Sequence, residues 1–212
     1  MTFDTGWWWK FQEEISVQFG FSKDREDVVS RLITGLKQNN SSIRDSIEKK
    51  DLVLVGAGLQ SSIEIPSSNV IVADGALRAC LEQDILPSLI VTDLDGYISD
   101  ISWARKKGSK VILHAHGDNI ARVFQYFEDI NPNCITTTYP SDSSNCWGGF
   151  TDGDRALMMS LSLNCNTIRM MGFDYSMIGD YSGDYSPRKL EKLAWAQKIV
   201  EACIERTNKI II

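Results

Sequence analysis

Two aspartates that directly follow an apolar run are the residues in this sequence best suited to chemistry. Asp93 and Asp95 come just after the run 89–91 and just before Gly96. In extended backbone, residues two apart point to the same side, so we expect both carboxylates to converge. Two carboxylates suit a hard cation such as Mg²⁺, which fills its other positions with water and substrate phosphates. The alternative is that both are turn or capping residues, where Asp and Gly are common.

Other acids follow predicted strands or open predicted helices. Asp74 could be a helix N-cap. Because its strand should end at the same sheet edge as that of Asp93, we favour a metal or ribose contact. Asp152 and Asp154 repeat the spacing of two in a glycine-rich loop that enters a helix. Capping explains one of these acids, and Asp154 is a candidate metal or substrate ligand, with Arg155 as a charge partner for an acid or a phosphate.

Both histidines of the chain lie in one hexapeptide, which continues as His116, Gly117, Asp118 and Asn119. His114 and His116 lack the further ligands that a zinc site needs. We therefore expect residues 116–119 to begin a helix and to present polar groups to the phosphate or ribose of a nucleotide. The alternative is that Asp118 caps the helix and that the neighbouring histidine makes its hydrogen bonds within the protein.

Further candidates for phosphate or substrate contacts are glycines, lysines and one more acid. Gly56 and Gly58 follow a predicted strand, where glycine lets backbone amides approach a phosphate, although a tight turn without ligand explains them equally well. Asp174 is another acid at the end of a predicted strand. Lys189 and Lys192, near the start of the last predicted helix, could neutralise phosphates or could form a solvated face.

Alternating strands and helices must position these residues. Short apolar or β-branched runs predict strands at 52–55, 70–73, 89–91, 111–113, 135–138, 168–171 and 210–212. Helical pattern is expected between them at 76–82, 98–106, 120–127, 155–163 and 189–205. This alternation predicts an α/β, Rossmann-like fold with a mostly parallel sheet covered by helices on both faces. Residues 1–50 are expected to form an N-terminal helical segment and residues 51–212 the α/β catalytic domain.

Composition excludes several classes of protein. The net charge of −6 and the pI near 5.0 argue against a nucleic-acid-binding protein, which would need a basic face. The five cysteines are odd in number and never in C-x-x-C spacing, so we expect neither a zinc cluster nor disulfides. A protein located in the reducing cytoplasm fits this cysteine pattern best. No run is long enough to span a membrane, and no secretory signal is visible.

Four motifs, at 74–76, 92–96, 114–119 and 150–156, occur in an order and spacing that resemble the archaeal 6-hydroxymethyl-7,8-dihydropterin diphosphokinase (MptE-like) family. The first two are also similar to motifs of thiamine pyrophosphokinase. The resemblance covers residues 50–205, and the tryptophan-bearing N-terminus is also similar to that family. One departure is Leu59-Gln60-Ser61, which stands where the family motif G-A-G-P-S-L has Pro-Ser-Leu.

The resemblance implies Mg²⁺-dependent transfer of diphosphate from ATP to the hydroxymethyl group of a reduced pterin, releasing AMP. Asp93 and Asp95, helped by Asp74, would hold Mg²⁺, and Asp152 or Asp154 would orient or deprotonate the acceptor hydroxyl. From chemistry alone, Asp174 would pair with the amide and amino edge of the pterin. The alternatives are a thiamine-type diphosphokinase, a metal-dependent nucleotide-sugar glycosyltransferase, and a nucleotide-binding protein without turnover. The sequence leaves open whether the protein is a homo-oligomer.

Overall fold

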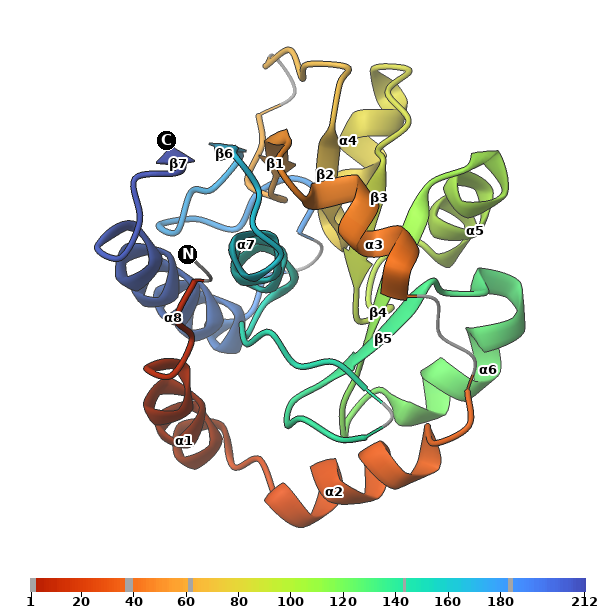
Figure 1. Ribbon diagram of the computed structural model, residues 1–212, viewed down its shortest axis with the longest axis vertical. Coiled ribbons are helices and arrows are strands. Elements are labelled where there is room, and N and C mark those ends of the chain that lie inside the picture. Colours follow the sequence, from red (N-terminus) through yellow and green to blue (C-terminus); the bar gives the residue numbers. More distant parts are fainter. Residues whose placement is uncertain (1–2, 37–39, 61–62, 143, 183–184) are drawn as a thin grey trace.

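A computed structural model describes residues 3–36, 40–60, 63–142, 144–182 and 185–212, and a parallel sheet lies at its centre (Figure 1). Within this part of the chain the sheet has seven strands in the order β5-β4-β3-β2-β1-β6-β7, and every pairing is parallel. The strands are β1 (Asp51–Val55), β2 (Val70–Ala73), β3 (Leu89–Thr92), β4 (Lys110–Ala115), β5 (Cys134–Thr137), β6 (Thr167–Met171) and β7 (Ile210–Ile211). The predicted strands and the α/β class are confirmed.

In the described part of the chain, three α-helices precede the sheet and five more lie between its strands. The first three are α1 (Trp8–Phe19), α2 (Lys23–Leu32) and α3 (Asn40–Ile47). The others are α4 (Leu77–Glu82), α5 (Ile98–Lys107), α6 (Ile120–Ile130), α7 (Asp152–Ser162) and α8 (Pro187–Ile204), and a 3-10 turn (Asp74–Ala76) leads into α4. None of the helices in the described ranges combines the length and apolar character needed to cross a membrane.

Strands β1 to β6 contribute side chains to two hydrophobic cores, one on either face of the sheet. Leu89 and Val91 of β3 belong to a core shared with α1, α7 and α8, whereas Ile90 belongs to a core shared with α4, α5 and α6. Successive side chains of a strand point to opposite faces, so a strand that is apolar throughout must be covered on both. This is why the strands appear in the sequence as short continuous apolar runs.

The first two helices form an arm, residues 8–32, that runs along the edge of the sheet where β4 and β5 end (Figure 1). Near the end of α1, Gln18 Oε1 accepts from the Trp195 indole of α8 at 2.8 Å. Near the start of α2, Arg25 donates to Gly117 O at 2.8 Å and pairs with Asp118 at 3.0 Å. The N-terminal arm is therefore held on both sides of the turn between α1 and α2, against the side of the sheet where ligands of α/β proteins bind.

The three consecutive tryptophans face different ways, as their adjacency requires. Trp8 is buried in the core, Trp7 packs edge-on against Phe11, and Trp9 is exposed and stacks on Tyr139 with ring centroids 6.1 Å apart. Trp9 thus ties α1 to the segment after β5.

The crevice between β1 and β6, where the strand order reverses, is closed by glycine-to-backbone packing. The amide of Gly56 donates to Met171 O at 2.8 Å, and that of Gly58 donates to Gly172 O at 2.9 Å. A Cβ on Gly56 would lie 2.7 Å from Gly172 O, so this approach requires glycine. Both amides are occupied by protein carbonyls, and we do not assign them to a phosphate. Ser61, in the segment that departs from the family motif, lies outside the described residues.

We predict that Gly172→Ala destabilises the protein by about 2–4 kcal/mol, because its positive φ of +72° and a Cβ 2.5 Å from Gly56 O both oppose a side chain. Gly20→Ala is the matched control, since Gly20 has φ +70° but nothing within 4 Å of a Cβ. It should cost only about 1–2 kcal/mol. Urea unfolding measures both, and equal losses would show that the packing of the two loops contributes nothing.

Candidate active site

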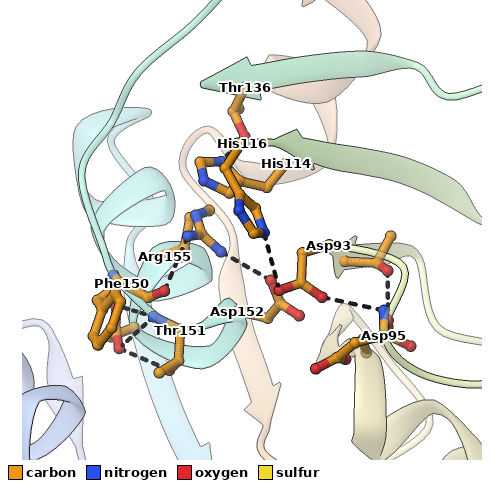
Figure 2. Close-up of polar contacts among 12 residues, drawn as sticks. Asp93, Asp95, His114, His116, Thr136, Phe150, Thr151, Asp152 and Arg155 are labelled. Atoms are coloured by element: carbon orange, nitrogen blue, oxygen red, sulfur yellow. Dashed lines mark hydrogen bonds and ion pairs between the residues drawn. The ribbon is translucent and has the colours of Figure 1, made fainter. Parts of the chain in front are cut away.

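Four aspartates meet where β2 and β3 end and α7 begins. Asp74, Asp93, Asp95 and Asp152 each offer a carboxylate oxygen, and these atoms lie within 4.8 Å of one another. Figure 2 shows Asp93 between the carboxylates of Asp95 and Asp152. We call these four residues the acid cluster. Such a set of hard oxygen ligands is suited to Mg²⁺.

Asp74 is the most buried residue of the acid cluster, with 3% of its surface exposed. One oxygen, Oδ2, accepts from the Thr92 hydroxyl at 2.5 Å and from the Gly96 amide at 3.2 Å. The other, Oδ1, is buried and has no hydrogen-bond partner among the residues that the structure describes. A buried carboxylate oxygen without a partner is unfavourable, and a bound cation would satisfy it.

Asp93 and Asp95 reach the cluster through a turn, so the expectation of extended backbone between them is wrong. Leu94 has a left-handed φ of +68°. Its amide donates to Thr92 Oγ1 at 2.7 Å, and the Asp95 amide donates to Asp93 Oδ1 at 3.2 Å. The turn folds the chain back over the end of β3, and this brings the two carboxylates together.

Crowding of negative charge shows in the proton affinities of the cluster. Burial, with the charges of Asp95 and Asp93, raises the pKa of Asp74 to about 7. Burial and the charge of Asp93 raise the pKa of Asp95 to about 6. Burial and then the charge of Asp93 also raise the pKa of Asp152 well above its usual value. Without a cation the cluster therefore holds protons near neutral pH, and a bound metal would displace them.

Two cationic or polar side chains offset part of this charge (Figure 2). Burial opposes ionisation of Asp93, but the hydrogen bond and charge of His116, together with the charge of Arg155, lower its pKa to about 2. His116 Nε2 lies 3.8 Å from Asp93 Oδ2, and Arg155 Nη1 lies 2.9 Å from Asp152 Oδ1. Arg155 thus fulfils its expected role as a charge partner of an acid.

Asn119 braces the loop after β4 against the loop after β3. Its Nδ2 donates to Asp93 O at 2.8 Å and to His114 O at 2.7 Å, while its Oδ1 accepts from the His116 amide at 2.9 Å. Helix α6 begins at the next residue, as expected. Because all these partners are backbone groups, Asn119 positions Asp93 and His116 rather than offering its side chain to ATP.

Gly117 and Asp118, also expected to contact ATP, are held by the N-terminal arm. The Gly117 amide donates to Glu26 Oε1 at 2.9 Å, and Asp118 pairs with Arg25 at 3.0 Å. The Gly117 amide is therefore occupied by protein. Of residues 116–119, His116 is the one whose side chain reaches the acid cluster.

A cavity of about 400 Å³ adjoins the acid cluster and is lined by Asp93 and Asp95 at one end. This volume lies near the lower limit for small-molecule sites, roughly 300–1,000 Å³. Residues of the arm, of β4, β5 and α8, and of the loop before α7 complete its wall. Its lining includes Gln12, Phe21, Glu26, His114, His116, Thr136, Thr137, Thr138, Trp147, Phe150, Arg155, Arg188 and Lys192.

The first turns of α8 supply two cations of the cavity, in addition to Arg122 and Arg155. Lys192 lies over the Phe150 ring at 5.8 Å, and Arg188 lies 5.4 Å from the Phe19 ring centroid. Both line the cavity. Lys189 instead donates to Ser182 O and is not part of the described lining. Arg188 was not predicted from the sequence as a site residue. Its spacing of four from Lys192 places the two side chains on one helix face, and this could have indicated it.

Two predicted site residues lie elsewhere. Asp154 is fully buried and forms a capping box with Thr151: its carboxylate accepts from the Thr151 hydroxyl at 2.7 Å and from the amides of Thr151 and Phe150. Asp174 is exposed and accepts from the amide and hydroxyl of Ser176 at 2.9 and 2.6 Å. We therefore assign neither to the acid cluster nor to the cavity.

We predict that Gly96→Ala reduces Mn²⁺ affinity by roughly 10–100-fold, the loss typical of a disturbed outer shell. A Cβ on Gly96 would overlap Asp74 Oδ1, so the carboxylate must move. Gly96 is absent from the residues with positive φ, so its backbone accepts alanine. Calorimetric titration with Mn²⁺ measures the affinity, and unchanged affinity in a folded variant would remove Asp74 from the site.

The pH dependence of stability gives a second prediction. A carboxyl group whose pKa rises from 3.8 to about 7 on folding stabilises the protein fully below pH 4 and loses this contribution as the pH rises through 7. The melting temperature of metal-free protein should therefore fall less between pH 5 and pH 7.5 in Asp74→Asn than in wild type, because asparagine does not ionise. The amide oxygen of the variant still accepts from Thr92 and Gly96, so these two contacts are kept. Scanning calorimetry in EDTA measures this. Parallel curves for both proteins would show that Asp74 carries no such charge repulsion.

Comparison with known proteins agrees with the motifs. The family model described as 6-hydroxymethylpterin diphosphokinase MptE-like matches residues 29–180. Three similar proteins carry the name 6-hydroxymethyl-7,8-dihydropterin pyrophosphokinase. That of Methanothermobacter thermautotrophicus is 33% identical over 97% of both chains, and that of Methanocaldococcus jannaschii is 31% identical over 96% of this chain and 92% of its own. That of Pyrococcus furiosus is 32% identical over 92% of this chain and 91% of its own. The chain therefore belongs to the MptE-like family of 6-hydroxymethylpterin diphosphokinases.

Proposed function

We propose that this protein transfers diphosphate from ATP to the hydroxymethyl group of 6-hydroxymethyl-7,8-dihydropterin in a Mg²⁺-dependent reaction that releases AMP. The observation that carries the proposal is the acid cluster, with its unpartnered Asp74 Oδ1, at the end of a cavity that also contains cations. The names of the three archaeal relatives supply the substrate. The acidic and the basic groups together match a reaction between a metal-bound triphosphate and a neutral alcohol.

Asp74, Asp93 and Asp95 are the residues that we assign to Mg²⁺. Their donor set is entirely carboxylate oxygen, which this ion prefers, and Asp74 Oδ1 is free to accept it. Bound Mg²⁺ would neutralise charge on the phosphates and polarise the phosphorus under attack. The protein's own part is to hold these three carboxylates in place before ATP arrives.

Arg188 and Lys192 are assigned to the phosphates. Both face the cavity from α8, and the Lys192 charge already acts on Asp93 and Asp95. Phosphoryl-type transfer needs little covalent chemistry from the protein, and it depends on positioning and on stabilisation of charge. A cation pair opposite the acid cluster would let the triphosphate lie between positive groups on both sides.

In the reaction, the acceptor hydroxyl oxygen forms a bond to the β-phosphorus of ATP. The bond from that phosphorus to the oxygen bridging the α-phosphate breaks, and AMP leaves with this oxygen. We assign the proton of the hydroxyl to Asp152. Its carboxylate is fixed by Arg155 at 2.9 Å, and its raised pKa suits a group that must accept a proton near neutral pH.

The experiment is phosphorus NMR of ATP, Mg²⁺ and 6-hydroxymethyl-7,8-dihydropterin with purified protein. Formation of AMP and a diphosphate ester supports the proposal. Thiamine as acceptor and UDP-glucose as donor are the controls for the two alternative transfers. Unchanged ATP with the pterin, or faster turnover of either control, would overturn the proposed substrate.

We predict opposite outcomes for the same substitution at two aspartates. Asp93→Asn should lower kcat at least about 100-fold and change the unfolding free energy by less than about 1 kcal/mol, because this carboxylate serves charge at the site rather than packing. Asp154→Asn should lower stability by about 1–2 kcal/mol through loss of its capping box. Steady-state kinetics and urea unfolding measure both. A near-normal rate for Asp93→Asn would show that its role is structural.

A further inference from the structure

Glu26 is a buried carboxylate that the proposed transfer step does not use. It lies on α2 in the N-terminal arm, is 7% exposed, and lines the cavity. Its Oε1 accepts from the Gly117 amide at 2.9 Å, and its Oε2 accepts from the Thr138 hydroxyl at 2.8 Å. Both donors are uncharged, so the negative charge of Glu26 is not balanced by them.

No ion pair to Glu26 occurs within the described ranges of the chain, where its neighbour Arg25 pairs with Asp118. Buried acids are nearly always paired with a cation, and Glu26 has only two uncharged donors. Its carboxylate can therefore accept further hydrogen bonds. A carboxylate offers about four lone-pair positions, and the protein fills two. A ligand with two parallel N–H donors could use one position on each oxygen.

The other carboxylates of the cavity have different partners. Asp93 and Asp95 belong to the acid cluster, and Asp118 is half-exposed and bound to Arg25. Glu26 is therefore the carboxylate that remains for recognition at the end of the cavity formed by β4 and β5. The Asp174 carboxylate, which the sequence suggested for this task, is exposed and outside the described lining.

The ring next to the acid cluster belongs to the acceptor, and this conclusion rests on the proposed function. One methylene group separates the attacking oxygen from the pterin ring, whereas the ribose and the α-phosphate separate adenine from the β-phosphorus. A ring in the same cavity of about 400 Å³ as Asp93 and Asp95 is therefore the acceptor ring. His114 and Thr136, which hydrogen-bond to each other at 3.0 Å, form an uncharged part of this wall (Figure 2). Burial, with the charges of Arg155 and His116, lowers the pKa of His114 well below its usual value.

We propose that Glu26 binds the amide N–H and the amino group on the pyrimidine edge of the acceptor and so selects a 2-amino-4-oxo heterocycle. Glu26, Phe21 and Gln12 all precede the range 29–180 that the family model matches, so that match assigns nothing to them. The N-terminal arm is, on this account, the specificity-determining wall of the site.

The test uses fluorescence titration of the full chain with 6-hydroxymethylpterin and with its 2-oxo analogue 6-hydroxymethyllumazine, in the presence of Mg²⁺ and α,β-methylene-ATP. Wild type should prefer the pterin. Glu26→Gln keeps the shape and an oxygen for the Gly117 amide, but it should bind the pterin about 10- to 100-fold more weakly. Its affinity for the lumazine should change by less than about threefold, so the preference collapses.

Arg25→Gln is the matched control, because it removes two contacts between the arm and the same loop while leaving the Glu26 carboxylate in place. It should retain the preference for the pterin. If Arg25→Gln loses the preference to the same extent, or if Glu26→Gln keeps it, Glu26 only anchors the arm and the inference is wrong.

The outcome is separable from that of the proposed function. Turnover of the pterin by wild type together with an unchanged preference in Glu26→Gln overturns this inference alone. Selective pterin binding that depends on Glu26, without formation of AMP, supports the inference and overturns the proposed transfer. Absence of pterin binding by wild type overturns both.

Discussion

Repulsion among four carboxylates in one small volume is the constraint on which the rest of this structure depends. The protein offsets it only in part, through Arg155 beside Asp152 and His116 near Asp93. Asp74 keeps a buried oxygen without a partner among the described residues, and its pKa is raised to about 7. The Mg²⁺ that we propose would offset this repulsion, and the protein has already gathered the carboxylates that would bind it.

The surrounding elements keep the carboxylates from relaxing apart. Asn119 joins the ends of β3 and β4 through backbone groups, and the capping box of Asp154 fixes the first turn of α7, which carries Asp152. Packing of Gly56 against Gly172 closes the crevice between β1 and β6, so the open space of the site lies beside β4 and β5 instead. The N-terminal arm then provides the wall that faces this space. Rigid support of this kind is what charge-based catalysis requires.

Much of this could be predicted from the sequence, because a strand buried on both faces is a continuous apolar run and the acids follow such runs directly. The rule that parallel strands end at one edge was enough to bring Asp74 and Asp93 together. What failed depends on partners distant in sequence. The amide of Gly56 is taken by a carbonyl more than a hundred residues away, and nothing local indicates this. The docking of Glu26 against the loop after β4 is equally invisible, since helical periodicity does not say where a helix packs. Asp154 fits a capping box and a ligand pair alike, and only its contacts distinguish the two.

We propose that the acid cluster holds the divalent cation that carries the nucleotide. Anomalous diffraction from crystals grown with Mn²⁺ and α,β-methylene-ATP tests it most directly. The account predicts an anomalous peak within coordination distance of Asp74 Oδ1 and of the Asp93 and Asp95 carboxylates, in contact with the phosphates. A fully bound nucleotide whose metal lies away from these residues, with Asp74 Oδ1 still unpartnered, would contradict it.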